Sequence, residues 1–340
     1  MKKFILCVGL LLAGLTSCTN NEVIDVPQEK NAIQFKAPFV GKNTRGTDAA
    51  IITTDAVNHI HVFGKHIASD ATNVANSTEI FDNTKLEKSN GYTSDVSWVA
   101  NRLYSFAAYI DGTAGADQGD NASFDLVDLT SSKLTISNYT VTGNDLVVAM
   151  PEDIRTTTTS NYPVPLAFTH TLSKVRFTFT NAESSRYNMG VSEIKIANAY
   201  NQGNLTVAKT ASSVATAAWD LGNSHSKDGY EFTSVTDITP TETDYTEYFV
   251  IPQNIEQLSV TFKITLTDNQ TSTTEYMEYT ASLATGIVSW TPRYAYNYNL
   301  AISAHHIDPD LSDKIKFTLT VNPWVDQVDQ NLTPTQIGNS

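Results

Sequence analysis

The sequence predicts an all-β protein, on three observations. Thr, Ser, Asn, Tyr, Val and Ile dominate the 340 residues, and Thr and Tyr favour strands. Long blocks of Leu, Ala, Glu and Lys, which are typical of helices, are missing. Apolar and polar residues alternate in segments such as Val175–Phe179 and Val260–Ile264, a period of two that buries one face of a strand. Many short strands separated by turns indicate β-sandwiches, and this length requires two of them.

The chain begins with the features of a bacterial lipoprotein signal. A basic start precedes an apolar segment from Phe4 to Leu15, which is too short to span about 30 Å of hydrocarbon. Small residues then lead to Cys18. We predict a signal peptide at residues 1–17 and an acylated, palmitate-bearing Cys18 that anchors the chain to a membrane. Because the other cysteine, Cys7, lies within the signal, no disulfide is expected in the mature chain.

Charge excludes one class of partner. The formal net charge of −14 becomes −16 when Lys2 and Lys3 leave with the signal. Nucleic acid requires a basic footprint, so no nucleic-acid partner is expected. The acidic balance is also unsuited to anionic lipid headgroups and is typical of a soluble protein at a cell surface.

The first elements follow the signal directly. Residues 18–30 are polar and acidic with one proline, which predicts a flexible tether. Ile33, Phe35 and Ala37 then alternate with polar residues, which predicts a short half-buried strand. The composition from Pro38 to Asp48 is typical of an exposed loop.

Further strands are predicted at short spacing in two groups. The boundary between the groups is placed near residues 156–165, in a polar segment, which gives an N-terminal β-sandwich at 31–160 and a C-terminal β-sandwich with a tail at 161–340. The first group comprises Asn58–Ile67, Arg102–Ile110, Lys133–Thr140 and Leu146–Met150. The second group comprises Val164–Phe168, Leu172–Thr180, Val191–Ala197, Tyr248–Pro252, Leu258–Thr267, Glu275–Leu283, Tyr294–Ile302 and Ile315–Val321.

An ordered series of motifs runs along the chain. The most specific is Pro165–Lys174, which reads PLAFTHTLSK and leads to Phe177. The others, in order, are Ile33–Phe35, Thr44–Arg45, Val62–Gly64, Trp98 with Tyr104–Tyr109, Phe249–Gln253, Trp290 with Tyr294–Tyr298, and Val321–Trp324. Together with the lipoprotein signal, this series resembles the fimbrillin family of Bacteroidales over nearly the whole chain.

The resemblance implies a subunit of type V pili. It implies two tandem transthyretin-like Greek-key β-sandwiches, exported as a surface-exposed lipoprotein of the cell outer membrane, and adhesion through a fimbria built with other pilus subunits. In polymerising members a trypsin-like protease cuts after an arginine in the first loop, and Arg45, followed by Gly46, lies where that cut would fall. An exposed loop also accommodates an ordinary arginine, and both interpretations stay open here.

The residues themselves favour a displaceable first strand. Removing Ile33, Phe35 and Ala37 would uncover an apolar groove, at roughly 1.5–3 kcal/mol for each large side chain. Neighbouring strands would keep unpaired backbone groups, which a donated strand would pair again. The apolar residues of the tail after Trp324 do not alternate, and Pro334 interrupts them. Such a tail suits a tip or accessory subunit better than a shaft subunit.

No enzyme signature is present. The sequence lacks a G-x-S-x-G elbow, an HExxH motif and a glycine-rich phosphate loop, so neither catalysis nor a cofactor is expected. His59 and His61 share a strand face but lack further ligands, and solvated histidines are favoured over a metal site. The acidic runs at 117–120 and 308–310 lack the order of a calcium loop.

Aromatic residues leave a second function open. Trp98, Trp290, Tyr294, Tyr296 and Tyr298 could stack on sugars, although a half-buried packing stripe is favoured. The alternative to a pilus subunit is therefore a monomeric surface lipoprotein that binds glycans. The two differ at the N-terminus, because a shaft subunit loses its lipid and first strand whereas a glycan binder keeps both. Shaft, tip or anchor position and the identity of a host or bacterial receptor are left open.

Overall fold

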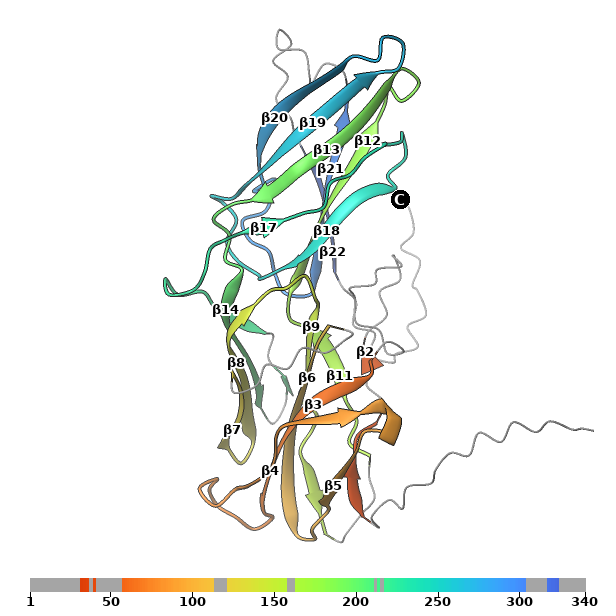
Figure 1. Ribbon diagram of the computed structural model, residues 1–340. Helices are drawn as coiled ribbons and strands as arrows, with labels where there is room; N and C mark the ends of the chain where they lie inside the picture. Colours follow the sequence, from red (N-terminus) through yellow and green to blue (C-terminus); the bar gives the residue numbers. More distant parts are fainter. Residues whose placement is uncertain are drawn as a thin grey trace, which may run out of the picture.

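A computed structural model describes residues 31–36, 39–40, 57–112, 121–157, 163–210, 213–214, 217–303 and 317–323. Within these ranges the chain consists mainly of strands, with a short 3-10 helix at Lys88–Asn90, which confirms the all-β prediction. No helix in this part of the chain is long and apolar enough to cross a membrane. The molecule is elongated, with later strands at one end and earlier strands at the other (Figure 1).

The end formed by the earlier strands contains two sheets and a ribbon. A seven-stranded sheet runs in the order β2-β11-β9-β6-β3-β4, with β10 also paired to β6. Its strands are β2 (Phe39–Val40), β3 (His59–Ala68), β4 (Thr78–Glu87), β6 (Arg102–Asp111), β9 (Leu146–Ala149), β10 (Ile154–Thr156) and β11 (Ala167–His170). The five-stranded sheet contains β7 (Ala122–Asp128), β8 (Ser131–Thr140), β14 (Gln202–Thr210), β15 (Ser213–Val214) and β16 (Ala218–Asp220). The ribbon pairs β1 (Ala32–Gln34) with β5 (Thr93–Ser97).

The other end contains two four-stranded sheets. The β12 sheet runs β18-β12-β21-β22 and the β13 sheet runs β17-β13-β19-β20. The strands of the first are β12 (Ser173–Asn181), β18 (Asp244–Val250), β21 (Tyr294–Ile302) and β22 (Thr318–Pro323). Those of the second are β13 (Tyr187–Ile196), β17 (Tyr230–Glu231), β19 (Ser259–Asp268) and β20 (Thr274–Ser282). Most pairs are antiparallel, and β12–β21 and β2–β11 are parallel.

Alternation explains how these strands form a core. In β19, Val260, Phe262 and Ile264 are buried while the residues between them are exposed or half-buried. Residues of this kind from the β12, β13, five-stranded and seven-stranded sheets join in one continuous hydrophobic core. The opposite face of the seven-stranded sheet forms a second core together with the β1–β5 ribbon. The seven-stranded sheet is therefore covered on both faces.

Strand pairing crosses the expected domain boundary. β14 pairs with β8, and β11 pairs with β9, so segments from both sides of residue 160 share sheets at the same end of the molecule. The division into sandwiches at 31–160 and 161–340 stays a prediction. Segments 202–210 and 218–220 lie in the five-stranded sheet, with strands that precede the boundary.

Candidate functional site: the first strand and its groove

The first strand is held mainly by its side chains. Ile33 and Phe35 are 0% and 1% exposed, whereas Gln34 between them and Ala32 before them are half-buried. This alternation is the one that the sequence predicts for residues 33–37, and it aims both large side chains into the second core. Ala37, the third residue of the predicted set, lies outside the described residues.

Backbone groups on both sides of the first strand complete its contacts. On one side, Phe35 N–H donates to the Tyr92 carbonyl at 3.1 Å, and Trp98 N–H donates to the Asn31 carbonyl at 2.9 Å. On the other side, Lys36 N–H donates to the carbonyl of Val164 at 2.8 Å, and Val164 N–H donates to the Gln34 carbonyl at 2.7 Å. The strand therefore fills a slot between β5 and the segment around Val164.

The side with Val164 continues as a parallel pairing. Phe35 bridges Val164 in parallel, and farther along the chain Phe39 pairs with Ala167 and Val40 with Phe168. On the side that faces β5, where the pairing is antiparallel, the Ser94 hydroxyl adds a hydrogen bond and donates to the Ile33 carbonyl at 2.8 Å. Removal of residues 31–40 would thus free backbone groups on two unrelated parts of the chain.

Aromatic rings form the floor of the groove under Phe35. Its ring contacts Phe81 and Phe106 edge to face, with centroids 5.9 and 5.5 Å apart. Gly64 makes room for these rings, because a Cβ there would lie 2.8 Å from Phe81 Cδ2 and 2.9 Å from Phe106 Cδ1. Gly64 belongs to the Val62–Gly64 motif, so the sequence did carry a signal for this pocket.

Two tyrosines line the same core as neutral hydrogen-bonding groups. Burial raises the pKa of Tyr92, and the Glu87 carboxylate raises it further. Burial also raises the pKa of Tyr104, against the lowering effect of its hydrogen bond with Val99 and of Arg102. Tyr92 donates its hydroxyl to the Val57 carbonyl at 2.9 Å. The hydroxyls satisfy polar backbone inside an otherwise apolar groove.

The most specific motif of the sequence has structural partners. His170 Nδ1 lies 2.8 Å from Asp145 Oδ2, and both side chains are buried. Lys174 Nζ lies 3.3 Å from Glu247 Oε2, and Arg176 Nε donates to the same carboxylate oxygen at 2.6 Å. The first pair joins the end of β11 to the residue before β9, and the other two join β12 to β18 in the β12 sheet, so residues of the motif and Arg176 link strands in two different sheets.

The remaining predicted site residues are those outside the described ranges, two histidines and five aromatic residues. Cys18, Arg45 and Gly46 lie outside the described residues, as do both acidic runs. His59 and His61 are buried and not solvated, because they face the core beneath the seven-stranded sheet, where His61 stacks on Tyr109. In the part of the chain that the structure describes, no group of three or more His, Cys, Asp or Glu side chains could share a metal ion.

The predicted aromatic residues mostly pack in the core. Trp98, Trp290, Tyr296 and Tyr298 are buried, and only Tyr294 of the five is exposed. The Trp290 indole N–H donates to the Tyr298 hydroxyl at 3.2 Å, which donates in turn to the Leu283 carbonyl at 3.1 Å. The packing interpretation therefore holds for four of the five.

Comparisons with known proteins agree with this architecture. Solved structures with a similar fold include a fimbrial protein from Bacteroides vulgatus, with a TM-score of 0.52 at 13% identity over 87% of this chain and 100% of that one. A candidate cell adhesion protein from Bacteroides ovatus gives 0.49 at 16% identity over 88% and 98%, and one from Bacteroides uniformis gives 0.44 at 14% over 87% and 99%. No curated protein matches.

The family itself is set by the sequence. A family model described as fimbrillin-like matches residues 44–324, which is more than half of the 340-residue chain. The match includes the Val62–Gly64 motif, which contributes to the aromatic pocket, and the Pro165–Lys174 motif, which runs through β11 into β12. The chain therefore belongs to the fimbrillin-like family.

Proposed function

We propose that this protein is a structural or accessory subunit of a cell-surface pilus, and that it assembles by donor-strand exchange after its N-terminus is processed. Membership of the fimbrillin-like family supports a pilus or adhesion subunit. In this proposal the chain folds as two transthyretin-like sandwiches and is carried to the outer membrane by lipid on Cys18. The observation that supports strand exchange is the seating of Ile33 and Phe35.

The first strand gains most of its binding free energy from the burial of these two apolar side chains, and its backbone pairing is short. Both side chains are fully buried, although β1 has three residues. Burial of two such side chains contributes roughly 3–6 kcal/mol in all. Loss of the strand would expose Phe81, Phe106 and Val164 and leave backbone groups unpaired at two edges. A segment from another subunit with a branched residue and an aromatic residue two positions apart would restore both contributions.

The proposed trigger is a cut between Arg45 and Gly46. This bond follows the residues that pair with β11, so the cut would separate the whole first strand, together with Cys18 and its lipid, from the body. Loop backbone opens at lower cost than paired strands, so a trypsin-like protease should reach Arg45 before the sheets. The product would start at Gly46 with an empty groove.

Limited trypsin digestion tests this step. The full chain should lose residues 1–45 first, as read by mass spectrometry, and the trimmed protein should form oligomers in size-exclusion chromatography. The double variant Lys42→Gln/Arg45→Gln should resist this first cut and remain monomeric under the same digestion, because trypsin also cuts after lysine. If Arg45 is not cut, or if the trimmed protein remains a stable monomer, donor-strand exchange is wrong for this chain.

Peptide complementation tests the groove separately from the cut. A peptide with the sequence of residues 31–40 should bind the trimmed protein and raise its melting temperature, because a ligand that binds only the folded state stabilises it. The same peptide with Phe35→Ala should bind at least about 100-fold more weakly, since it lacks the ring that fills the pocket. Equal binding of the two peptides would contradict a ring-specific groove.

The tail refines the proposed position in the pilus. Residues 325–340 include Pro334 and no aromatic residue, so they lack a ring for the pocket under Phe35. This favours a tip or accessory subunit that receives a strand from another protein. Cell-bound protein that begins at Cys18 and retains its first strand would favour the monomeric glycan-binding lipoprotein instead, and N-terminal sequencing distinguishes the two.

A further inference from the structure

The outer face of the β13 sheet is rich in hydroxyl and amide groups. Strand register places Gly190, Thr265 and Tyr276 in one row across β13, β19 and β20. The neighbouring row contains Asn188, Thr267 and Thr274, and the last two share a hydroxyl contact of 3.0 Å. These side chains point away from the core, because the residues that alternate with them are the buried ones of β13 and β19.

Two adjoining cavities open on this face. The smaller, of about 260 Å³, lies over Gly190 and is bordered by Thr265, Thr267 and Asp237. The larger, of about 360 Å³, extends from Asn188 and Asp237 to Tyr187 and Asn269. Both are lined by Asn188 and Asp237, so the two cavities adjoin at these residues and together make up the depression on this face. Their separate volumes lie near the lower end of the range of small-ligand sites.

The walls of the depression are held in place by hydrogen bonds. Asn188 Nδ2 donates to Asp237 Oδ1 at 2.8 Å, which leaves the carboxylate beside the opening. The segment that carries Asp237 is fixed to β13 by reciprocal backbone bonds of 2.8 Å between Val191 and Val235. The polar groups are therefore positioned before any ligand arrives, which reduces the entropy cost of binding.

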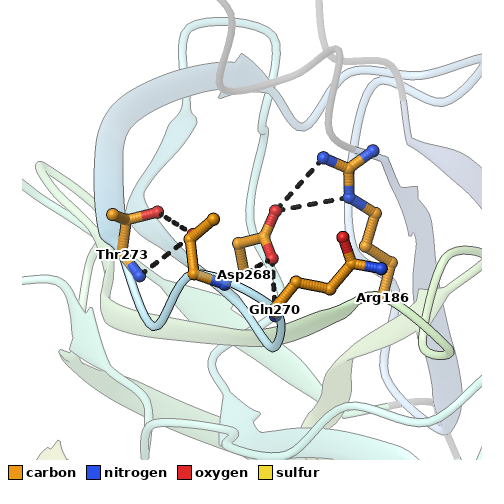
Figure 2. Close-up of polar contacts among 5 residues, drawn as sticks. Arg186, Asp268, Gln270 and Thr273 are labelled. Carbon is orange, nitrogen blue, oxygen red and sulfur yellow. Dashed lines mark hydrogen bonds and ion pairs between the residues drawn. The ribbon is translucent and has the colours of Figure 1, made fainter.

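The far end of the depression is fixed by the β19–β20 turn (Figure 2). Asp268 accepts hydrogen bonds from Gln270 N–H at 2.7 Å and from the Arg186 guanidinium at 3.2 Å. The backbone N–H of Gln270 lowers the pKa of Asp268, and the N–H of Thr271 and the Arg186 guanidinium add to that lowering, so the carboxylate stays charged in the turn. Asn269 N–H donates to the Arg186 carbonyl at 2.9 Å, which holds the cavity-lining Asn269.

An exposed aromatic ring borders the same face. Tyr276 is 63% exposed and lies directly across from Thr265, at a separation where side chains on neighbouring strands touch. Lys263 Nζ sits 4.0 Å from the centre of its ring. This cation lies over one face of the ring, and most of the tyrosine side chain is exposed.

We propose that this depression and Tyr276 form a binding site for a neutral carbohydrate. Sugar hydroxyls both donate and accept hydrogen bonds, which matches the mixture of threonine hydroxyls, the Asn188 amide and the Asp237 carboxylate. The apolar face of a sugar ring packs on an exposed aromatic ring such as that of Tyr276. Asp237 and Glu278 on this face and the net charge of −14 oppose polyanionic ligands. The site does not depend on donor-strand exchange.

Affinity electrophoresis of the full chain tests the site. Gels contain yeast mannan, laminarin, desialylated gastric mucin or, as the polyanion, heparin. At least one neutral polymer should retard the protein, and heparin should not. Tyr276→Ala should weaken that retardation roughly tenfold, which corresponds to the loss of one ring contact. Gly190→Thr should abolish retardation, because the threonine side chain would fill the smaller cavity. The fold should tolerate this change, since the new Cβ would lie 3.4 Å from the Val235 carbonyl oxygen, an ordinary contact distance.

A matched control exists on the other sheet. Tyr245 on β18 is also exposed, at 37%, and also carries a cation, with Arg176 Cζ 3.9 Å from its ring centre. Tyr245→Ala should leave retardation unchanged. Melting temperatures identify any variant that fails to fold. The proposal is overturned if none of the neutral polymers retards the protein, if folded Tyr276→Ala and Gly190→Thr bind as the parent does, or if Tyr245→Ala loses binding equally.

Discussion

Two strands at opposite ends of the molecule are held in opposite ways. β1 has three residues and pairs with β5 at two positions, but Ile33 within it and Phe35 directly after it are fully buried. β20 has nine residues and pairs with β19 continuously from Thr274 to Ser282. All nine are described, and Ala281 alone is buried. One strand is held by its side chains and the other by its backbone.

The difference indicates which strand another segment could replace. Side-chain burial can be reproduced by any extended segment with similar residues at alternating positions. A long, regular ladder opens at a cost that grows with every pair, and its exchange would bring little new burial. β1 therefore suits assembly, whereas β20 suits a permanent surface, such as the one that carries Tyr276.

Phe35→Ala gives the largest expected effect on this comparison. It should lower the free energy of unfolding by about 3–5 kcal/mol, because it empties the pocket formed by Phe81 and Phe106. Met277→Ala, on the half-buried inner face of β20, should cost much less. Urea denaturation followed by tryptophan fluorescence measures both. Equal losses would remove the distinction between the two strands.

Gly64→Ala should have an intermediate effect. Its Cβ would crowd Phe81 and Phe106, and overpacking of this kind costs about 1–3 kcal/mol. Gly222→Ala is the matched control and should be close to neutral, since its nearest contact would be 3.8 Å away. Combined with Phe35→Ala, the cost of Gly64→Ala should shrink, because the rings can move into the empty space. Strict additivity would show that the three rings do not share one pocket.

His66 on β3 gives the smallest effect, a dependence on pH. Burial lowers its pKa below 6.5, and Arg102 lowers it further. The unfolded chain therefore binds more protons than the folded chain in this window. The contribution of neutral His66 is fully present above about pH 6.5 and is lost as the pH falls through the folded pKa. His66→Gln should flatten the acid side of the urea midpoint profile, and an unchanged slope would contradict this assignment.

Much of the fold is predictable from alternation. The segments predicted at Arg102–Ile110, Leu258–Thr267 and Tyr294–Ile302 lie within one residue of β6, β19 and β21. Alternation did not reveal β4 or β5, because their residues are mostly exposed or half-buried and carry little apolar pattern. β14 was not predicted either, although its buried residues alternate, and the sequence did not reveal which sheet it joins. That depends on pairing between residues some seventy positions apart, which no local pattern encodes.

The candidate sites were predictable in part. The alternation of apolar and polar residues identified Ile33 and Phe35 as inward-facing, and both are buried in the structure. Val164 could not be paired with Phe35 from the sequence, since a parallel bridge leaves no turn signal between its partners. Tyr276 was missed because a lone tyrosine in an edge strand resembles an ordinary strand residue. His59 and His61 were expected to be solvated. Their burial, with His61 stacked on Tyr109, could not be predicted because histidine is a polar residue that the alternation pattern counts as exposed.

The parallel bridge between Phe35 and Val164 also bears on the order of folding. Synthesis delivers the chain from its N-terminus, and these two residues lie 129 positions apart. The first strand therefore waits for its second neighbour until half of the protein has emerged, while β3 meets β4 almost at once. Contacts this distant in sequence form slowly. During that delay Ile33 and Phe35 are exposed to other chains, so a chaperone that holds the unfolded chain should raise the yield of folded protein.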